Sequence, residues 1–159
     1  MAALEPGKVF PDIELEMESG TRFVAPEGEA LYGFFKTTCP TSELAWPYYD
    51  RIRRIGDKGL PTFAVSQDDR AETATFNRRL EVGLETLYDP PPWKASSALR
   101  LTNVPTFFLV GSNGRIRSTV VGFQRPRLEE LARRAAYLSG RPQSRLFRIG
   151  DQIPLIVPG

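Results

Sequence analysis

Apolar residues in this chain gather into short runs that are separated by glycine, proline and polar turns. Runs of strand length occur at residues 21–25, 30–36, 60–67, 84–89, 106–110 and 115–121. The runs at 30–36 and 60–67 are almost continuously apolar, which is typical of strands that are buried on both faces. Gly-Ser-Asn-Gly at residues 111–114 joins the last two runs and predicts a hairpin.

Between these runs, apolar residues recur at spacings of three and four, which is the pattern of one helix face. A helix is expected to follow Cys39 and to end at Gly56, with an apolar face of Leu44, Tyr48, Ile52 and Ile55. Further helices are expected at residues 70–80, 93–101 and 127–138. The last of these has Leu128, Leu131, Ala135 and Leu138 on one face.

Strands that alternate with helices imply crossover units and a parallel section of sheet. The closing hairpin adds antiparallel strands. The expected fold class is therefore α/β, with a mixed central β-sheet flanked by helices on both faces. Residues 1–138 are expected to form this domain, and residues 139–159 a C-terminal extension without clear periodicity. We expect the apolar end of the extension, residues 153–157, to pack on the domain rather than to recruit a partner.

The chain of 159 residues contains a single cysteine and no histidine. One cysteine cannot form an internal disulfide. Zinc or haem held by clusters of Cys and His is excluded within one chain, and so are hydrolases that pair Ser or Cys with His. We therefore expect no metal and no cofactor.

Charge is unevenly distributed although the net charge is only +2. Residues 1–30 hold seven acids and two bases, and residues 115–148 hold nine arginines and two glutamates. A basic run can bind nucleic acid, but a solvated helix face with a polar tail is favoured here, and no nucleic-acid partner is expected. No run reaches the ~18 apolar residues of a membrane span. The first residues do not resemble a signal peptide, so a cytoplasmic protein is expected, or alternatively an exported one whose signal was removed.

The sharpest candidate for chemistry is Cys39, in the segment Lys36-Thr-Thr-Cys-Pro-Thr-Ser42. It lies between the end of an expected central strand and the start of a helix, where open α/β sheets place their sites. Free N–H groups at a helix N-terminus favour a thiolate, which is the nucleophilic form. Ser42, one turn along, is expected to donate its hydroxyl to the sulfur, and Lys36 adds a nearby positive charge.

Cys39-Pro-Thr-Ser42 resembles the Cys-x-x-Cys site of thioredoxin-like proteins, with serine in the second position. Pro47 matches the proline that kinks the active-site helix of that family. Residues 103–109, with the following hairpin turn and Gly122, are similar to the segment that carries the thioredoxin cis-proline. The resemblance implies that Val104-Pro105 is cis and faces the sulfur. Cys39 and Ser42 would then be the catalytic positions, and the partner would be bound by Thr38, Pro40, Val104 and Pro105.

The resemblance extends over about residues 7–138. Its opening residues and the insert around residues 70–100 are similar to the TlpA and ResA subgroup. Several positions depart from the family patterns. Thr38 replaces the usual tryptophan, Gly33 stands where thioredoxins carry a buried aspartate, and Ser42 replaces the resolving cysteine. The peroxiredoxin signature also fails, because its proline and hydroxyl positions hold Tyr32 and Lys36.

Without a second thiol, a mixed disulfide at Cys39 cannot be released internally. The favoured hypothesis is a monothiol thiol-disulfide oxidoreductase in which an external thiol completes the cycle. Its partner would be a thiol- or disulfide-containing protein or a small thiol such as glutathione. The alternatives are a one-Cys peroxidase, a non-catalytic module that binds an extended peptide beside Pro105, and an iron–sulfur cluster carrier. The carrier is disfavoured, because Pro40-Thr41 replaces the Gly-Phe of that motif.

Overall fold

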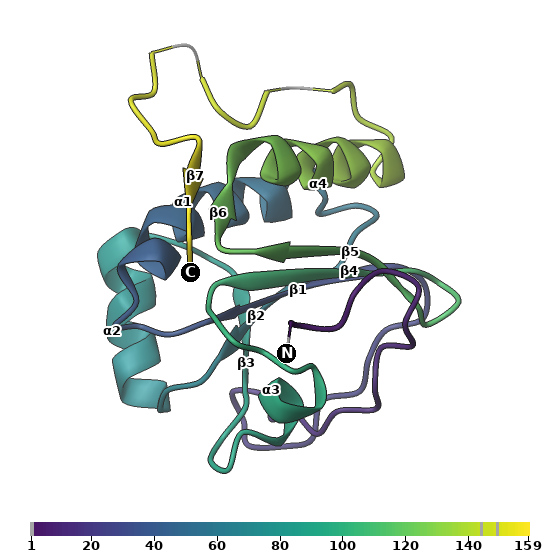
Figure 1. Ribbon diagram of the computed structural model, residues 1–159, viewed down its shortest axis with the longest axis vertical. Coiled ribbons are helices and arrows are strands. Elements are labelled where there is room, and N and C mark those ends of the chain that lie inside the picture. The colour runs from purple at the N-terminus through teal and green to yellow at the C-terminus, as the bar shows by residue number, and fades with distance from the viewer. Residues whose placement is uncertain (1, 144, 149) are drawn as a thin grey trace.

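Five strands form one mixed sheet in the computed structural model, which describes residues 2–143, 145–148 and 150–159. The strands are β1 (Ala30–Phe35), β2 (Thr62–Ser66), β3 (Glu85–Tyr88), β4 (Thr106–Val110) and β5 (Ile116–Val121). Their spatial order is β3-β2-β1-β4-β5, as Figure 1 shows. Strands β1, β2 and β3 are parallel, whereas β4 pairs antiparallel with both β1 and β5. The expected mixed sheet with a closing hairpin is confirmed.

Helices cover both faces of the sheet. They are α1 (Pro40–Ile55), α2 (Arg70–Leu80), α3 (Lys94–Ala98) and α4 (Arg125–Leu138). Buried side chains of α1, α2 and α4 share one apolar cluster with the sheet. The opposite face is covered by α3 and by the irregular chain before β1. The expected α/β fold class is therefore confirmed, although one face is covered largely by irregular chain.

The central strand β1 explains the continuously apolar run in the sequence. All six of its residues are buried. Leu31 and Phe35 point into the cluster of α1 and α4, whereas Tyr32 and Phe34 point into the opposite cluster. Alternate side chains of a strand face opposite sides of the sheet, so a strand covered on both sides is apolar at every position.

Two expectations about the pattern were wrong. Residues 21–25 are not a strand, because Arg22 makes only an isolated bridge to Glu16. The apolar signal there comes from Phe23, which packs edge-on against Phe63 with ring centroids 5.0 Å apart. Burial of a side chain on top of the sheet thus produced a strand-like pattern without a backbone ladder.

The buried face of α1 is rotated from the predicted one. Ala45, Trp46, Tyr49 and Ile52 are fully buried, whereas Leu44, Tyr48 and Ile55 are only half-buried. Leu44, Tyr48 and Ile55 lie beside the most deeply buried face of the helix. There the Tyr48 ring packs at a tilt against that of Phe147, with the ring centroids 4.6 Å apart. Periodicity found an apolar stripe, but it could not identify which part of the stripe faces the sheet.

Element bounds differ slightly from the expected ones elsewhere. The helix predicted at residues 70–80 is confirmed as α2. Helix α3 is shorter than the predicted 93–101, and α4 begins at Arg125 rather than at residue 127. Within the described ranges, no helix has the length and apolar character that crossing a membrane requires.

The chain after α4 returns to the fold. Leu146 and Phe147 are buried in the cluster of α1 and α4, where the Glu129 carboxylate accepts both of their backbone N–H groups at 3.1 Å. Further on, β7 (Ile156–Val157) pairs antiparallel with β6 (Phe123–Gln124). Because these contacts lie on the body of the fold, the division at residue 138 stays a prediction.

Candidate functional site

Cys39 is the N-cap residue of α1 and lies four residues after the end of β1, directly after the connecting turn. Its backbone is extended, with φ −91° and ψ 115°, and its N–H donates to the Lys36 carbonyl at 3.2 Å. Thr37 N–H donates to Asp68 Oδ2 at 2.7 Å. Asp68 follows β2, so the ends of two parallel strands together fix the turn that presents the cysteine. Sequence reasoning missed Asp68; an acid directly after a buried strand was the available signal.

The sulfur has two polar neighbours. Ser42 N–H donates to Cys39 Sγ over 3.4 Å, and the thiol donates to the Val104 carbonyl at 3.3 Å. The N–H at the helix terminus favours the thiolate. The carbonyl, in contrast, accepts a hydrogen bond only from the protonated thiol. The half-buried sulfur is therefore placed where both forms have a partner.

The expected role of the Ser42 hydroxyl was wrong. Its side chain is fully buried, and its Oγ has no hydrogen-bond partner among the described residues. Ser42 is the third residue of the helix, and capping geometry brings the backbone N–H of this position to the cap side chain. The serine thus serves the sulfur through its amide rather than its hydroxyl. Lys36 is exposed and contributes its backbone carbonyl.

The loop before β4 supplies the other wall of the site. The Val104–Pro105 bond is cis, and Val104 presents its carbonyl to the sulfur. Thr106 Oγ1 donates to the Asn103 carbonyl at 2.8 Å and fixes the loop. The structure thus brings Val104 and Pro105 to Cys39, with Thr38 and Pro40 exposed on either side of the cysteine in the chain. Their use in partner binding stays a prediction.

A cleft of about 280 Å³ opens between the end of β1 and this loop. Its walls are formed by Lys36, Gln67, Trp93, Leu101, Thr102, Asn103 and Val104. Trp93 is 43% exposed, and its Nε1 donates to the Gln67 carbonyl at 3.1 Å. An indole held open to solvent by one hydrogen bond is a surface on which an apolar partner can pack. Sequence reasoning missed Trp93; a tryptophan after a run of three prolines was the available signal.

Tyr49 occupies the space that a side chain at Gly33 would need. A Cβ on Gly33 would lie 2.7 Å from Tyr49 Cε2. The buried Tyr49 hydroxyl donates to the Phe63 carbonyl at 2.7 Å, and burial raises the pKa of Tyr49 well above its usual value. A neutral phenol therefore fills this part of the core, and no carboxylate fits beside it.

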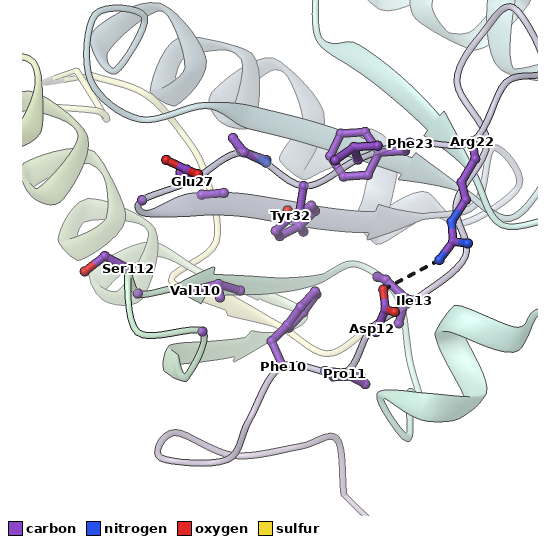
Figure 2. A pocket seen from close by; sticks show the side chains of 17 residues that line it. Phe10, Pro11, Asp12, Ile13, Arg22, Phe23, Glu27, Tyr32, Val110 and Ser112 are labelled. Atoms are coloured by element: carbon purple, nitrogen blue, oxygen red, sulfur yellow. Dashed lines mark ion pairs between the residues drawn. The ribbon is translucent and has the colours of Figure 1, made fainter.

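A second cavity lies elsewhere. It has a volume of about 790 Å³ and is lined by aromatic residues such as Phe10, Phe23 and Tyr32, with the Asp12–Arg22 ion pair at 3.8 Å (Figure 2). Ala30 also lines it. Because Ala30 begins β1 whereas Cys39 follows the end of that strand, this cavity is at the opposite end of the sheet from the sulfur. Burial raises the pKa of Tyr32 to about 12, so its hydroxyl stays neutral there near pH 7.

Comparison with solved structures identifies the fold. The chain is similar to a candidate thiol:disulfide interchange protein DsbE from Chlorobium tepidum, with a TM-score of 0.71 and 20% identity over 84% of this chain and 99% of that one. It is also similar to a thiol:disulfide interchange protein from Bacteroides sp., with a TM-score of 0.69 and 16% identity over 91% and 95%. StoA from Bacillus subtilis is similar as well, with a TM-score of 0.63 and 16% identity over 76% of this chain and 93% of that one.

No protein-family model and no curated protein matches the chain. At these identities, the structural likeness establishes the fold alone. The chain has a thioredoxin-like fold, and its structural neighbours include proteins described as thiol-disulfide oxidoreductases.

Proposed function

We propose that this protein is a monothiol thiol-disulfide oxidoreductase in which Cys39 is the nucleophile. The observation that carries the proposal is the position of the sulfur. It caps α1, receives the Ser42 N–H and contacts the carbonyl of Val104, a residue that also lines an open cleft. This combination supplies a thiolate-stabilising donor together with access for a partner.

The reaction follows from the single cysteine. The Cys39 thiolate attacks one sulfur of a disulfide, a Cys39–S–S–R bond forms, and the other half leaves as a thiolate that takes up a proton. An external thiolate then attacks the mixed disulfide at R and regenerates the Cys39 thiolate, with R now in a disulfide with the external thiol. A second external thiolate frees R. In the full cycle one disulfide is reduced and two external thiols are oxidised to a disulfide.

The partner is a thiol- or disulfide-bearing peptide or protein, or a small thiol such as glutathione. Thr38, Pro40, Val104 and Pro105 contact it in this proposal. Thr38 and Pro40 are exposed on either side of Cys39 in the chain, and Val104, which precedes Pro105, contacts the sulfur through its carbonyl. Ser42 acts through its backbone N–H, which stabilises the leaving Cys39 thiolate when the adduct is released.

Mass spectrometry of the intact chain tests the proposal. After exposure to oxidised glutathione, one glutathione per chain is expected on Cys39, and added reduced glutathione is expected to remove it. Cys39→Ser is the blank. A thiol that stays unmodified by glutathione under native conditions would contradict the proposal and favour the binding module. A sulfenic acid formed with peroxide, without a glutathione adduct, would favour the peroxidase.

A further inference from the structure

The chain's own residues 155–159, here called the return segment, lie against the residues that surround Cys39. The Pro158 carbonyl accepts the Thr41 hydroxyl at 2.9 Å. The Gly159 carbonyl accepts the Asn103 side-chain N–H at 2.7 Å. Thr41 follows Cys39 by two residues, and Asn103 directly precedes Val104. The segment is therefore held by both walls of the sulfur site, as Figure 1 shows for the yellow end of the chain beside α1.

Gly159 is packed closely on the carbonyl that the thiol contacts. A Cβ on Gly159 would lie 2.7 Å from the Val104 oxygen and 3.1 Å from Asn103 Cβ. Cys39 Sγ contacts the same Val104 oxygen at 3.3 Å. The return segment and the sulfur thus pack against the same Val104 carbonyl oxygen. Only a residue without a side chain fits at position 159.

Backbone groups hold the return segment far more than its side chains do. Arg125 N–H donates to the Leu155 carbonyl at 2.9 Å, and Ile156 and Val157 pair with β6. The Leu155 and Ile156 side chains are 59% and 60% exposed. An extended segment bound through its backbone, with little apolar burial, is the way in which a peptide is added to a strand edge. Segments of this kind open at a small fraction of the free energy of global unfolding.

We infer that the return segment occupies the groove in which an extended disulfide-bearing peptide binds to react with Cys39, so that segment and partner compete. The inference rests on the proposed function. The partner that fits is an extended chain that offers carbonyls to Thr41 and Asn103 and a small residue to Val104. Displacement of the segment frees these donors next to the sulfur.

Gly159→Val tests the competition, because its side chain cannot fit against Val104. The rate of Cys39 modification is measured with two probes. Oxidised glutathione is a peptide disulfide, and iodoacetamide is a compact alkylating reagent. We expect the variant to react at least about threefold faster with oxidised glutathione, in proportion to the released population. The iodoacetamide rate is expected to change much less.

Leu155→Ala is the matched control, since it changes an exposed side chain of the same segment and keeps the backbone bonds. It is expected to react like the wild type, and circular dichroism verifies that every variant is folded. Equal or slower reaction of Gly159→Val with oxidised glutathione overturns the competition, while an adduct in the wild type leaves the proposed function standing. Absence of an adduct in every variant overturns both.

Discussion

In the proposed reaction cycle, Ser42 determines how the reaction of Cys39 can end. It lies one helical turn from the sulfur, with a buried hydroxyl that has no partner among the described residues. A hydroxyl at this position cannot attack a mixed disulfide near neutral pH, because exchange requires a good sulfur nucleophile. The adduct at Cys39 therefore persists until an outside thiol arrives.

Ser42→Cys is expected to supply the missing nucleophile. The variant should form an internal disulfide and raise insulin reduction by on the order of tenfold or more, because attack within the chain replaces a bimolecular step. The assay uses a fixed concentration of chemical reductant, with Cys39→Ser as the blank. Glu43→Cys adds a thiol one residue further along the helix and controls for the mere presence of a second cysteine. A variant unable to form the bridge would contradict the placement of residue 42 beside the sulfur.

Gly33 is another position, besides Gly159, at which the absence of a side chain matters. Gly33→Ala places a methyl group 2.7 Å from the Tyr49 ring in a fully buried layer. Overpacking of this kind is expected to lower the free energy of unfolding by about 1–3 kcal/mol in urea denaturation. Gly83→Ala is the control, since its Cβ would meet only the end of the Arg53 side chain at 3.2 Å. Equal stability of the two variants would show that Tyr49 can move aside.

At the scale of elements, α3 depends on a carboxylate that precedes it. The helix has no side-chain cap at Trp93. Asp89, which is 1% exposed, instead accepts the N–H groups of Ala95 and Ser96 at 3.1 and 2.9 Å and the Ser96 hydroxyl at 2.6 Å. A carboxylate at a helix N-terminus satisfies donors that the helix cannot. The short helix that follows Trp93 is thereby fixed to the end of β3.

Asp89→Ala is expected to lower the free energy of unfolding by about 2 kcal/mol, because it leaves buried donors without partners. Urea denaturation measures the change. Asp69→Ala provides a matched comparison, since Asp69 caps α2 through one exposed bond to Glu72 N–H at 2.8 Å. That loss is expected to cost about 1 kcal/mol. A smaller effect at Asp89 than at Asp69 would contradict the role assigned to burial.

At the scale of the whole molecule, the arginine-rich run is bonded largely to the protein itself. Glu29 accepts Arg117 at 3.1 Å and Arg134 Nε at 3.0 Å, so the start of β1 is tied to β5 and α4. The hydrogen bond to Glu29 raises the pKa of Arg134. Arg125 donates to the Ile153 carbonyl at 3.3 Å and lies 5.0 Å from the centre of the Phe147 ring. These Arg125 contacts hold the chain that follows α4 against the domain.

Buried tyrosines, among them Tyr32 and Tyr49, are expected to make the stability of the whole fold sensitive to high pH. Burial raises the pKa of Tyr32 to about 12, and that of Tyr49 well above its usual value. A raised folded-state pKa leaves stability intact below the unfolded value of about 10 and removes it as pH rises toward the folded value. Above pH 10 each group is expected to lower the free energy of unfolding by about 1.4 kcal/mol per pH unit.

Urea denaturation between pH 9 and pH 11 measures this loss. Tyr32→Phe removes the contribution of Tyr32, so its stability should fall less steeply with pH than that of the wild type. Parallel profiles for the two proteins would contradict the burial of an ionisable hydroxyl at Tyr32.

The sequence by itself determined the order of the four helices and of the five strands in the central sheet, the parallel and antiparallel parts of that sheet, and the placement of Cys39 at a strand-to-helix junction. These features follow from periodicity, turn residues and spacing, which act between neighbours in the chain. The motif around Pro105 also marked the loop that meets the sulfur. Each of these signals depends on residues that are only a few positions apart in the chain.

The tertiary structure alone decided which groups meet at the site. Asp68 accepts a hydrogen bond from Thr37 N–H, Trp93 lines the cleft, and Gly159 packs closely against the Val104 carbonyl. Each contact joins residues from different elements, so no local pattern encodes it. The wrong predictions for the buried face of α1 and for a strand at residues 21–25 have the same cause. An apolar residue indicates that its side chain is buried, but it does not indicate which part of the protein buries it.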